Sequence, residues 1–180
     1  MTEQQLIVAC QEGSRKAQFE LYNRYAPSMY STCLRYCGNE SDAQDALQEG
    51  FTRVFKHLNR FNQSGSLEGW MRRIVINCSL TLIKKRNKHL SVEVQDYMAA
   101  DLKPSVLDVL SADEIHEIIC ELPDGYRTVF NLNVVEGYSH KEIAEMLGCG
   151  ESTSRTQLLK ARRMLQQLLA ARNHYVHATT

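Results

Sequence analysis

The sequence predicts an all-α protein built from two small helical domains that are joined by a flexible linker. Apolar residues recur at intervals of three and four through most of the 180 residues, which is the spacing of one helix face. The chain has only 3 prolines and 9 glycines, so long helices can form. A weakly periodic, acidic stretch separates the two helical halves. We therefore expect a domain at 1–90, a linker at 91–112, a second domain at 113–172 and a tail at 173–180.

The first domain is expected to hold three main helices. The first carries Met29 and Cys33 on its apolar face and stops at Gly38, since glycine readily takes the left-handed conformation that ends helices. Ser41 is expected to cap the second helix, with Gln44 as its capping-box partner. A loop at 63–66 precedes the third helix, which ends in the basic run 84–88. The outward face of the second helix is acidic and polar, and consists of Asp42, Asp45, Gln48 and Glu49.

The second domain begins with a helical pattern at Ile115, which the segment 122–125 interrupts and Gly137 ends. Ser139 and Glu142 then form a second capping box, and Gly148 supplies a left-handed turn residue. A longer basic helix runs from about 151 to 172. This order is typical of a helix-turn-helix unit, whose second helix enters the major groove of DNA. An ordinary helical hairpin with a basic flank is the alternative interpretation.

The charges are balanced overall, with 21 basic and 21 acidic residues, but they are unevenly distributed. Residues 60–89 hold seven basic residues and one acidic residue, and residues 152–172 hold five basic residues and no acidic one. Residues 90–125 hold nine acidic residues and one basic residue. Solvated helix faces could account for either basic patch alone, whereas two such patches favour two surfaces that bind nucleic acid.

The first turns of the longer basic helix hold the candidate base-reading residues. Arginine and glutamine can make bidentate hydrogen bonds to guanine and adenine, respectively. The candidate base contacts are Glu151, Ser152, Thr153, Arg155, Thr156 and Gln157. The candidate phosphate contacts, further along the same helix, are Lys160, Arg162 and Arg163.

Several other classes of protein are disfavoured. No run of about 18 apolar residues is present, and no basic stretch leads into an apolar N-terminal segment, so we expect a cytoplasmic protein without membrane insertion. The 6 cysteines form no Cys-x-x-Cys pair, which favours packing residues over a metal site. The 6 histidines are scattered, and neither a nucleophile motif nor a glycine-rich phosphate loop occurs. We therefore expect no enzyme activity, no cofactor and no metal.

Three motifs in this order resemble the extracytoplasmic-function group of bacterial RNA polymerase sigma factors, in the sigma-70 family. Residues 42–51, DAQDALQEGF, are similar to the second-region motif of that family. Residues 61–77 resemble its promoter-melting segment, and residues 122–130 and 137–144 resemble the entry to its fourth region. The resemblance covers nearly the whole chain and implies a transcription initiation factor.

The resemblance also implies partners and site residues. The first domain would bind the β′ clamp of core RNA polymerase and read the −10 promoter element as a single strand. The second domain would read the −35 element as a duplex. The β flap of the polymerase and an anti-sigma factor are further implied partners. The implied polymerase contacts are Asp42, Asp45, Gln48, Glu49 and Phe51. The implied −10 contacts are Arg60, Trp70, Arg73, Asn77, Lys84, Lys85 and Arg86.

Some interpretations stay open at the level of sequence. Trp70 fits a core residue or a stacking platform, and Asn77 fits a base pocket or a buried amide. Gly150 stands where the family usually has a serine cap, and Ser154 stands where a branched apolar residue is usual, which predicts a looser helix crossing. A stand-alone helix-turn-helix regulator is the alternative function. The acidic face at 42–49 argues against it, because a repressor needs no polymerase-docking surface.

Overall fold

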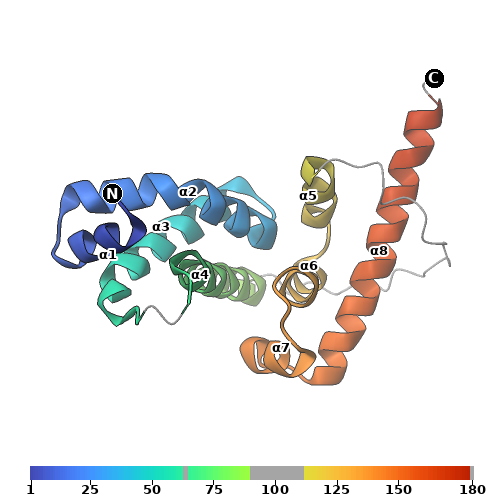
Figure 1. Ribbon diagram of the computed structural model, residues 1–180. Coiled ribbons are helices and arrows are strands. Elements are labelled where there is room, and N and C mark those ends of the chain that lie inside the picture. The colour runs from blue at the N-terminus through green and yellow to red at the C-terminus, as the bar shows by residue number, and fades with distance from the viewer. Residues whose placement is uncertain (63–64, 90–111, 179–180) are drawn as a thin grey trace. The chain divides into compact units, whose positions relative to one another are not determined.

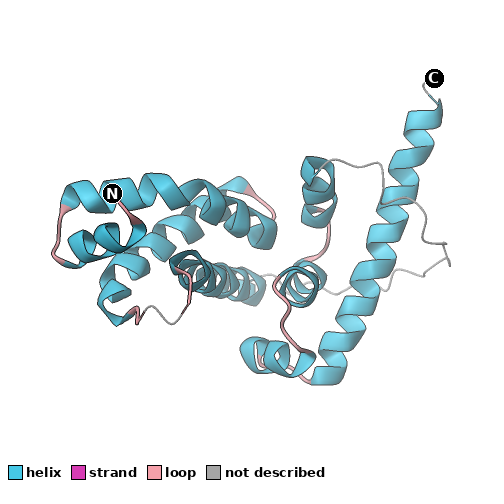
Figure 2. Ribbon diagram, viewed as in Figure 1, coloured by secondary structure: helices cyan, strands magenta, loops and turns pink. Residues whose placement is uncertain are grey.

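A computed structural model describes residues 1–62, 65–89 and 112–178. Within these ranges the chain forms helices and no strand, which confirms the all-α fold class (Figure 2). The chain divides into two units, Met1–Leu90 and Ser91–Thr180. The expected linker lies almost entirely at 90–111, outside the described residues. None of the described helices has the length and apolar content that crossing a bilayer requires.

Three long helices form the body of the first unit. These are α2 (Arg15–Cys37), α3 (Glu40–His57) and α4 (Leu67–His89), and each packs against the other two (Figure 1). The short 3-10 helix η1 (Leu58–Arg60) follows α3. The core lies where the three apolar faces meet, and its fully buried side chains include Leu21, Met29, Val54, Met71 and Val75.

A further helix, α1 (Glu3–Gln11), precedes this bundle and packs against α2. We did not expect it from the sequence, although its signal is present there, because Thr2 and Gln5 form a capping box ahead of the apolar Leu6 and Ile7. The Tyr25 hydroxyl of α2 donates a hydrogen bond of 2.6 Å to Glu3 Oε2. Burial and this hydrogen bond raise the pKa of Tyr25 to about 12.

The ends of α2 and α3 correct one expectation and confirm another. Gly38 ends α2 with a φ of 74°, as its sequence position predicts. Ser41 does not cap α3, because Asn39 does so: its Oδ1 accepts the amide N–H of Asp42 at 2.9 Å. Asn39 has extended backbone angles and lies directly after the turn at Gly38, so the helix begins two residues earlier than expected.

The second unit holds α5 (Ala112–Cys120), α6 (Asp124–Phe130), η2 (Asn131–Val135), α7 (His140–Leu147) and α8 (Glu151–Ala178). The long helix α8 contacts α5, α6 and α7 in turn (Figure 1). The expected break at 122–125 is confirmed, since α6 begins immediately after Pro123. Two features were not expected: η2 is a π-helical turn, and α8 continues through most of the expected tail.

A buried arginine joins α5 to α6. Arg127 is 4% exposed and donates hydrogen bonds to the carbonyl oxygens of Cys120 at 3.0 Å and Leu122 at 2.6 Å. It also forms an ion pair with Asp124 in the first turn of α6. These bonds satisfy carbonyl groups that the end of α5 leaves open, so Arg127 fixes the bend between the two helices.

Candidate functional site

The acidic face of α3 is exposed over two helical turns. Asp45, Gln48 and Glu49 all point to solvent, spaced by three and four residues. Glu49 forms an ion pair of 2.6 Å with Arg53 on the same helix. Within the described part of the chain Asp45 forms no ion pair, so its carboxylate is available to a basic partner.

Asp42 and Arg86 lie together, although the sequence assigned them to different surfaces. The half-buried guanidinium of Arg86 forms an ion pair with Asp42 and donates to the carbonyl oxygen of Cys37 at 3.4 Å. Arg86 therefore ties the end of α4 to the end of α2 and the start of α3. The two side chains thus hold the three helices together, and their implied roles as DNA and polymerase contacts stay predictions.

Phe51 also differs from its implied role as a polymerase contact. Its ring is 4% exposed and packs against Tyr22, with ring centroids 4.7 Å apart, and against Phe55 at 6.0 Å. These rings form the floor of a shallow hollow beside the acidic face. Phe51 thus supports the surface from below, because α3 turns position 51 toward α2.

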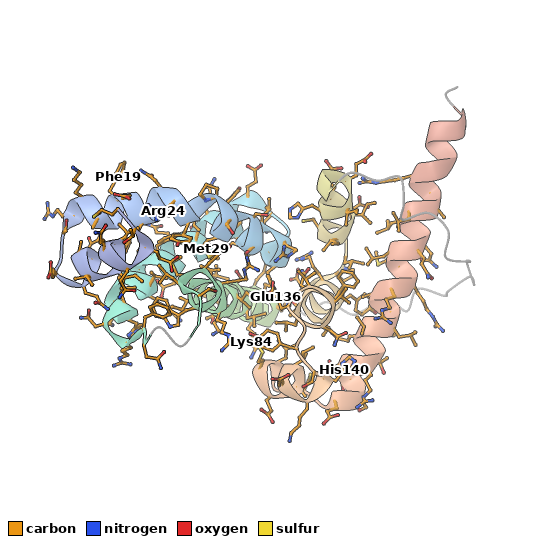
Figure 3. All side chains as sticks on the ribbon, in the orientation of Figure 1. Phe19, Arg24, Met29, Lys84, Glu136 and His140 are labelled. Carbon is orange, nitrogen blue, oxygen red and sulfur yellow. The ribbon has the colours of Figure 1, made fainter. Side chains whose placement is uncertain are left out.

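One line of α4 carries most of the residues implied in −10 binding. Residues 70, 73, 77 and 84 are separated by three, four and seven positions, so they share a face. Arg73, Asn77 and Lys84 are exposed, and Lys84 is labelled in Figure 3. Asn77 is therefore a surface amide and not a buried one. Arg60, on η1, is exposed as well.

Trp70 differs from the other members of that line because it is not fully exposed, and Lys85 lies off the line. Trp70 is half-buried and packs on Phe61, with ring centroids 5.4 Å apart, so part of its ring belongs to the core. Lys85 lines a hollow between α3 and α4 together with Asp45 and Glu49. Residues 63–64 of the loop expected at 63–66 lie outside the described residues, as do the side chains of 88 and 89.

The helix-turn-helix geometry of the second unit is as the sequence predicts. The Ser139 hydroxyl accepts the amide N–H of Glu142, and the Glu142 carboxylate accepts the amide N–H of Ser139 at 2.8 Å. Gly148 ends α7 with a φ of 70°. Ala144 is buried and Ser154 is 0% exposed, so the crossing of α7 and α8 is tight and not loose as expected.

The exposed face of α8 holds a polar surface of the kind that reads base edges. Its exposed members, all from the predicted set, are Glu151, Ser152, Thr153, Arg155, Thr156 and Arg163. Arg155 forms an ion pair of 3.0 Å with Glu151, and both side chains remain accessible. Lys160 is half-buried. Sequence reasoning missed Leu159, which is 50% exposed on this face, where a thymine methyl group could contact it.

Gln157 is turned away from that surface. A methyl group at Gly125 would lie 2.9 Å from Gln157 Oε1, so the amide of Gln157 occupies the space that this glycine leaves beside α6. The predicted base-reading role of Gln157 therefore needs correction. The contact spans 32 positions of the sequence, which local patterns do not connect.

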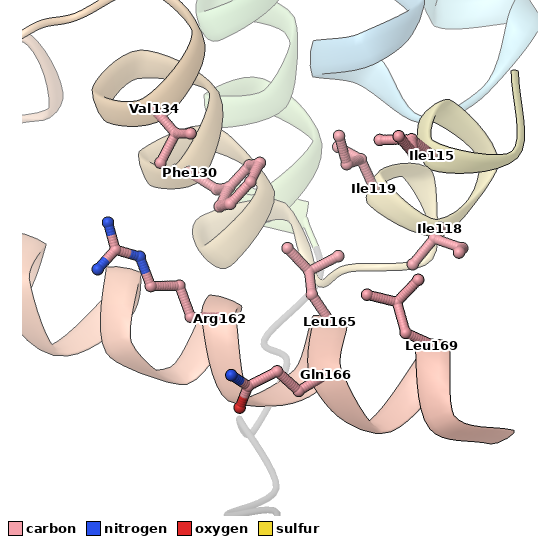
Figure 4. A pocket seen from close by; sticks show the side chains of 9 residues that line it. All are labelled: Ile115, Ile118, Ile119, Phe130, Val134, Arg162, Leu165, Gln166 and Leu169. Atoms are coloured by element: carbon pink, nitrogen blue, oxygen red, sulfur yellow. The ribbon is translucent and has the colours of Figure 1, made fainter. Parts of the chain in front are cut away.

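An apolar groove of about 330 Å³ opens beside α8 in the same unit. Ile115, Ile119 and Phe130 form one side, and Leu165 and Leu169 form the other (Figure 4). Arg162, one of the expected phosphate contacts, lies at its edge with Gln166. Val134 and Val135 are 47% and 44% exposed, which extends the apolar surface onto η2.

The described residues contain no group of three or more His, Cys, Asp or Glu side chains arranged to hold a metal ion. Four of the cysteines, Cys10, Cys33, Cys37 and Cys78, are buried as free thiols. Burial raises the pKa of Cys33 to about 12, so this thiol stays protonated at neutral pH.

Two family models match the chain, one in each unit. "Sigma-70 region 2" matches residues 21–89, and "Sigma-70, region 4" matches residues 112–165. Together they cover more than half of the 180 residues. The first match contains α3 and α4 with their acidic and basic surfaces, and the second contains the helix-turn-helix unit.

Similar proteins carry the same family name. The ECF RNA polymerase sigma factor SigE of Mycolicibacterium smegmatis is 31% identical over 84% of this chain, which spans 61% of that relative. The ECF RNA polymerase sigma-E factor of Haemophilus influenzae is 26% identical over 92% of this chain and 94% of its own length. The fold resembles the sigma factor RpoE of Bartonella quintana, solved with the anti-sigma factor NepR, at 19% identity and a TM-score of 0.53 over 84% of this chain and 95% of the other. This chain therefore belongs to the sigma-70 family of RNA polymerase sigma factors, in its extracytoplasmic-function group.

Proposed function

We propose that this sigma factor binds core RNA polymerase, directs it to promoters through a −10 and a −35 element, and helps to open the DNA. The observation that carries the proposal is that each of the two matched family regions contains exposed charged or polar surfaces suited to its role. The region 2 unit presents an acidic face on α3 and a polar, basic line on α4, and the region 4 unit presents the exposed face of α8. Since the polymerase works in the bacterial cytoplasm, this is the compartment that we assign.

The −10 element is bound as a single strand by the line on α4. Single-stranded DNA requires a basic track for the phosphates and polar or aromatic groups for extruded bases. Arg73 and Lys84 supply charge, Asn77 lies between them as an exposed amide, and the accessible edge of Trp70 lies one turn before Arg73. An amide in this place can hydrogen-bond the edge of a base that has left the stack.

The −35 element is bound as a duplex by α8. Arg155 and its neighbours at 152 and 156 are exposed in the first two turns, where a recognition helix contacts base edges. Arg163 lies two turns further on, where a phosphate contact is favourable. Neither unit offers many phosphate contacts, so strong promoter binding requires the polymerase to hold both units at promoter spacing.

Core polymerase is bound through two surfaces. The face formed by Asp45, Gln48 and Glu49 docks on the β′ clamp, where exposed carboxylates attract basic side chains. The apolar groove beside α8 accepts the β flap, because a concave apolar surface suits a hydrophobic partner segment. An anti-sigma factor is a third expected partner, as the complex of the Bartonella quintana protein suggests.

The proposal is tested by reversing charges on the acidic face. Asp45→Lys combined with Glu49→Lys should abolish copurification with core polymerase, because two repulsive charges replace two attractive ones. Both side chains are exposed, so the helical circular dichroism should stay unchanged. Glu12→Lys combined with Glu145→Lys is the matched control, with the same charge change at exposed sites directly after α1 and on α7. Normal copurification of the first variant would reject the docking surface and favour a stand-alone regulator.

A further inference from the structure

We propose that the hydrogen bond between His140 and Ser154 sets the rotation of the recognition helix α8, which makes both residues positioning residues for −35 reading. The inference rests on the proposed function, because it concerns how the −35 surface is presented. Neither residue belongs to the predicted set of DNA contacts. Ser154 Oγ and His140 Nδ1 lie 2.9 Å apart.

Ser154 lies at the centre of the helix crossing. Its side chain is 0% exposed, on the side of α8 that packs against α7. His140 is the first residue of α7 and follows the Ser139 cap directly (Figure 3). Because the capping box fixes this end of α7, the imidazole has a defined origin from which to bind α8.

A hydrogen bond constrains rotation more strictly than an apolar contact does. Side-chain tips of an α-helix lie about 5–6 Å from its axis, so a rotation of about 10° moves each tip by about 1 Å. Good hydrogen-bond distances span only about 0.5 Å, and the bonds weaken as their angle departs from linearity. A rotation of this size would weaken the His140–Ser154 bond and would also misalign a bidentate contact from Arg155 to a base. The bond is thus placed to keep the adjacent reading residues in register.

The packing of a second side chain, about one turn further along α8, acts in the same direction. Positions 154 and 157 share the inward side of the helix, and the Gln157 amide lies against Gly125 of α6. The recognition helix is therefore held by one polar side chain toward α7 and by another toward α6. Between and beside them, Ser152, Arg155 and Thr156 point outward.

The test is in vitro transcription by core polymerase carrying the full-length chain or its variants. A genomic promoter pool first identifies a responsive promoter, and single substitutions across its −35 element then give the discrimination at each position. Ser154→Val fills the crossing with an apolar side chain but removes the hydroxyl. His140→Asn keeps a polar atom at the place of Nδ1, whereas His140→Gln moves it outward. Thermal unfolding of each chain is recorded in parallel.

We expect Ser154→Val and His140→Gln to lower −35 discrimination by about three- to tenfold, the ratio that loss of one hydrogen bond corresponds to. The promoter preference should broaden or shift, and His140→Asn should retain most of the wild-type discrimination. The thermal midpoint of Ser154→Val should fall by no more than about 4–8 °C, the shift that loss of one hydrogen bond gives in a unit of this size.

Wild-type discrimination by Ser154→Val would overturn the inference. A uniform loss of transcription on every −35 sequence together with a lowered thermal midpoint would overturn it too, since the pair would then only support the fold. The −35 substitutions are measured with the wild-type chain before any variant is compared. If the wild-type chain showed no −35 preference, the proposed function itself would be wrong, and this outcome is distinct from a failure of the inference.

Discussion

Gly50 of α3 lies close against α4, the second of the two helices that carry the first unit's surfaces. A Cβ at this position would lie 2.6 Å from Val75 Cγ1 and 3.5 Å from Val75 Cα, on α4. Apolar carbons normally rest about 3.5–4.0 Å apart, so a methyl group requires a displacement of about 1 Å. Val75 is fully buried and has one preferred rotamer in a helix, so it cannot turn aside. Gly50→Ala should therefore separate α3 from α4.

The magnitude follows from two opposing effects. Alanine in place of glycine within a helix stabilises it by about 1 kcal/mol. Overpacking a close crossing costs about 1–3 kcal/mol, and this crossing is at the upper end because backbone and a branched side chain meet. The net loss should be about 1–2 kcal/mol, which lowers the thermal midpoint of a domain of this size by about 5–10 °C.

The assay is a double-mutant cycle with Val75→Ala, followed by thermal and urea unfolding. Val75→Ala alone should cost about 2 kcal/mol, from the loss of buried methyl groups and the cavity that remains. In the double variant the new methyl group of residue 50 enters that cavity, so the combined cost should be smaller than that of Val75→Ala alone. A stabilising effect of Gly50→Ala, or additive costs in the double variant, would refute the steric argument.

Three further predictions concern the sites. Arg155→Ala should weaken binding to the preferred −35 sequence by about 1–3 kcal/mol in a holoenzyme binding assay. Lys160→Ala should instead weaken binding to all DNA sequences alike and reduce the salt dependence of the affinity. Equal, uniform losses in both variants would contradict base reading. Asn77→Ala should impair DNA opening in permanganate footprints with normal closed-complex binding, and a pre-melted template that failed to rescue transcription would contradict a single-strand role. Arg127→Ala should destabilise the second unit by about 3–5 kcal/mol in urea unfolding, because Asp124 and two carbonyl groups lose a buried partner. An unchanged midpoint would show that the contacts of the Arg127 guanidinium are dispensable for stability.

The parts of the fold that the sequence predicts correctly depend on local chemistry. The all-α class follows from helical periodicity, and the helix-turn-helix unit follows from Ser139, Glu142 and Gly148, whose caps and turn act within a few residues of each other. Capping at the start of α3 shows the limit of such signals. Asn39 and Ser41 are both good caps, and the turn at Gly38 decides in favour of Asn39, since it places the extended residue directly ahead of the helix.

The candidate site is less predictable because its decisive contacts join distant segments. The ion pair between Asp42 and Arg86 spans 44 positions, and the His140–Ser154 bond spans 14. At the level of sequence a charged side chain is expected to be exposed and available, and the family resemblance implies that Arg86 contacts the −10 element. Whether such a group meets solvent or another helix depends on packing angles, which hydrophobic spacing does not encode.

The placement of Arg86 also explains how one small bundle keeps an acidic and a basic surface apart. α3 and α4 lie side by side. Basic side chains at the end of α4 could therefore fold onto the carboxylates of α3 and neutralise part of both surfaces. Lys85 already lies in the hollow next to Asp45 and Glu49. Arg86 forms an ion pair with Asp42 and donates a hydrogen bond to the Cys37 carbonyl. These contacts fix the end of α4 and occupy only one basic side chain, at the margin of the acidic face. Lys84, two positions before Arg86 and about 200° around the helix, then stays directed along the line of Arg73 and Asn77. Arg86 thus uses one basic side chain to hold the bundle together, while Lys84 stays on the exposed line that we propose for DNA and Asp45 and Glu49 stay on the face that we propose for the polymerase.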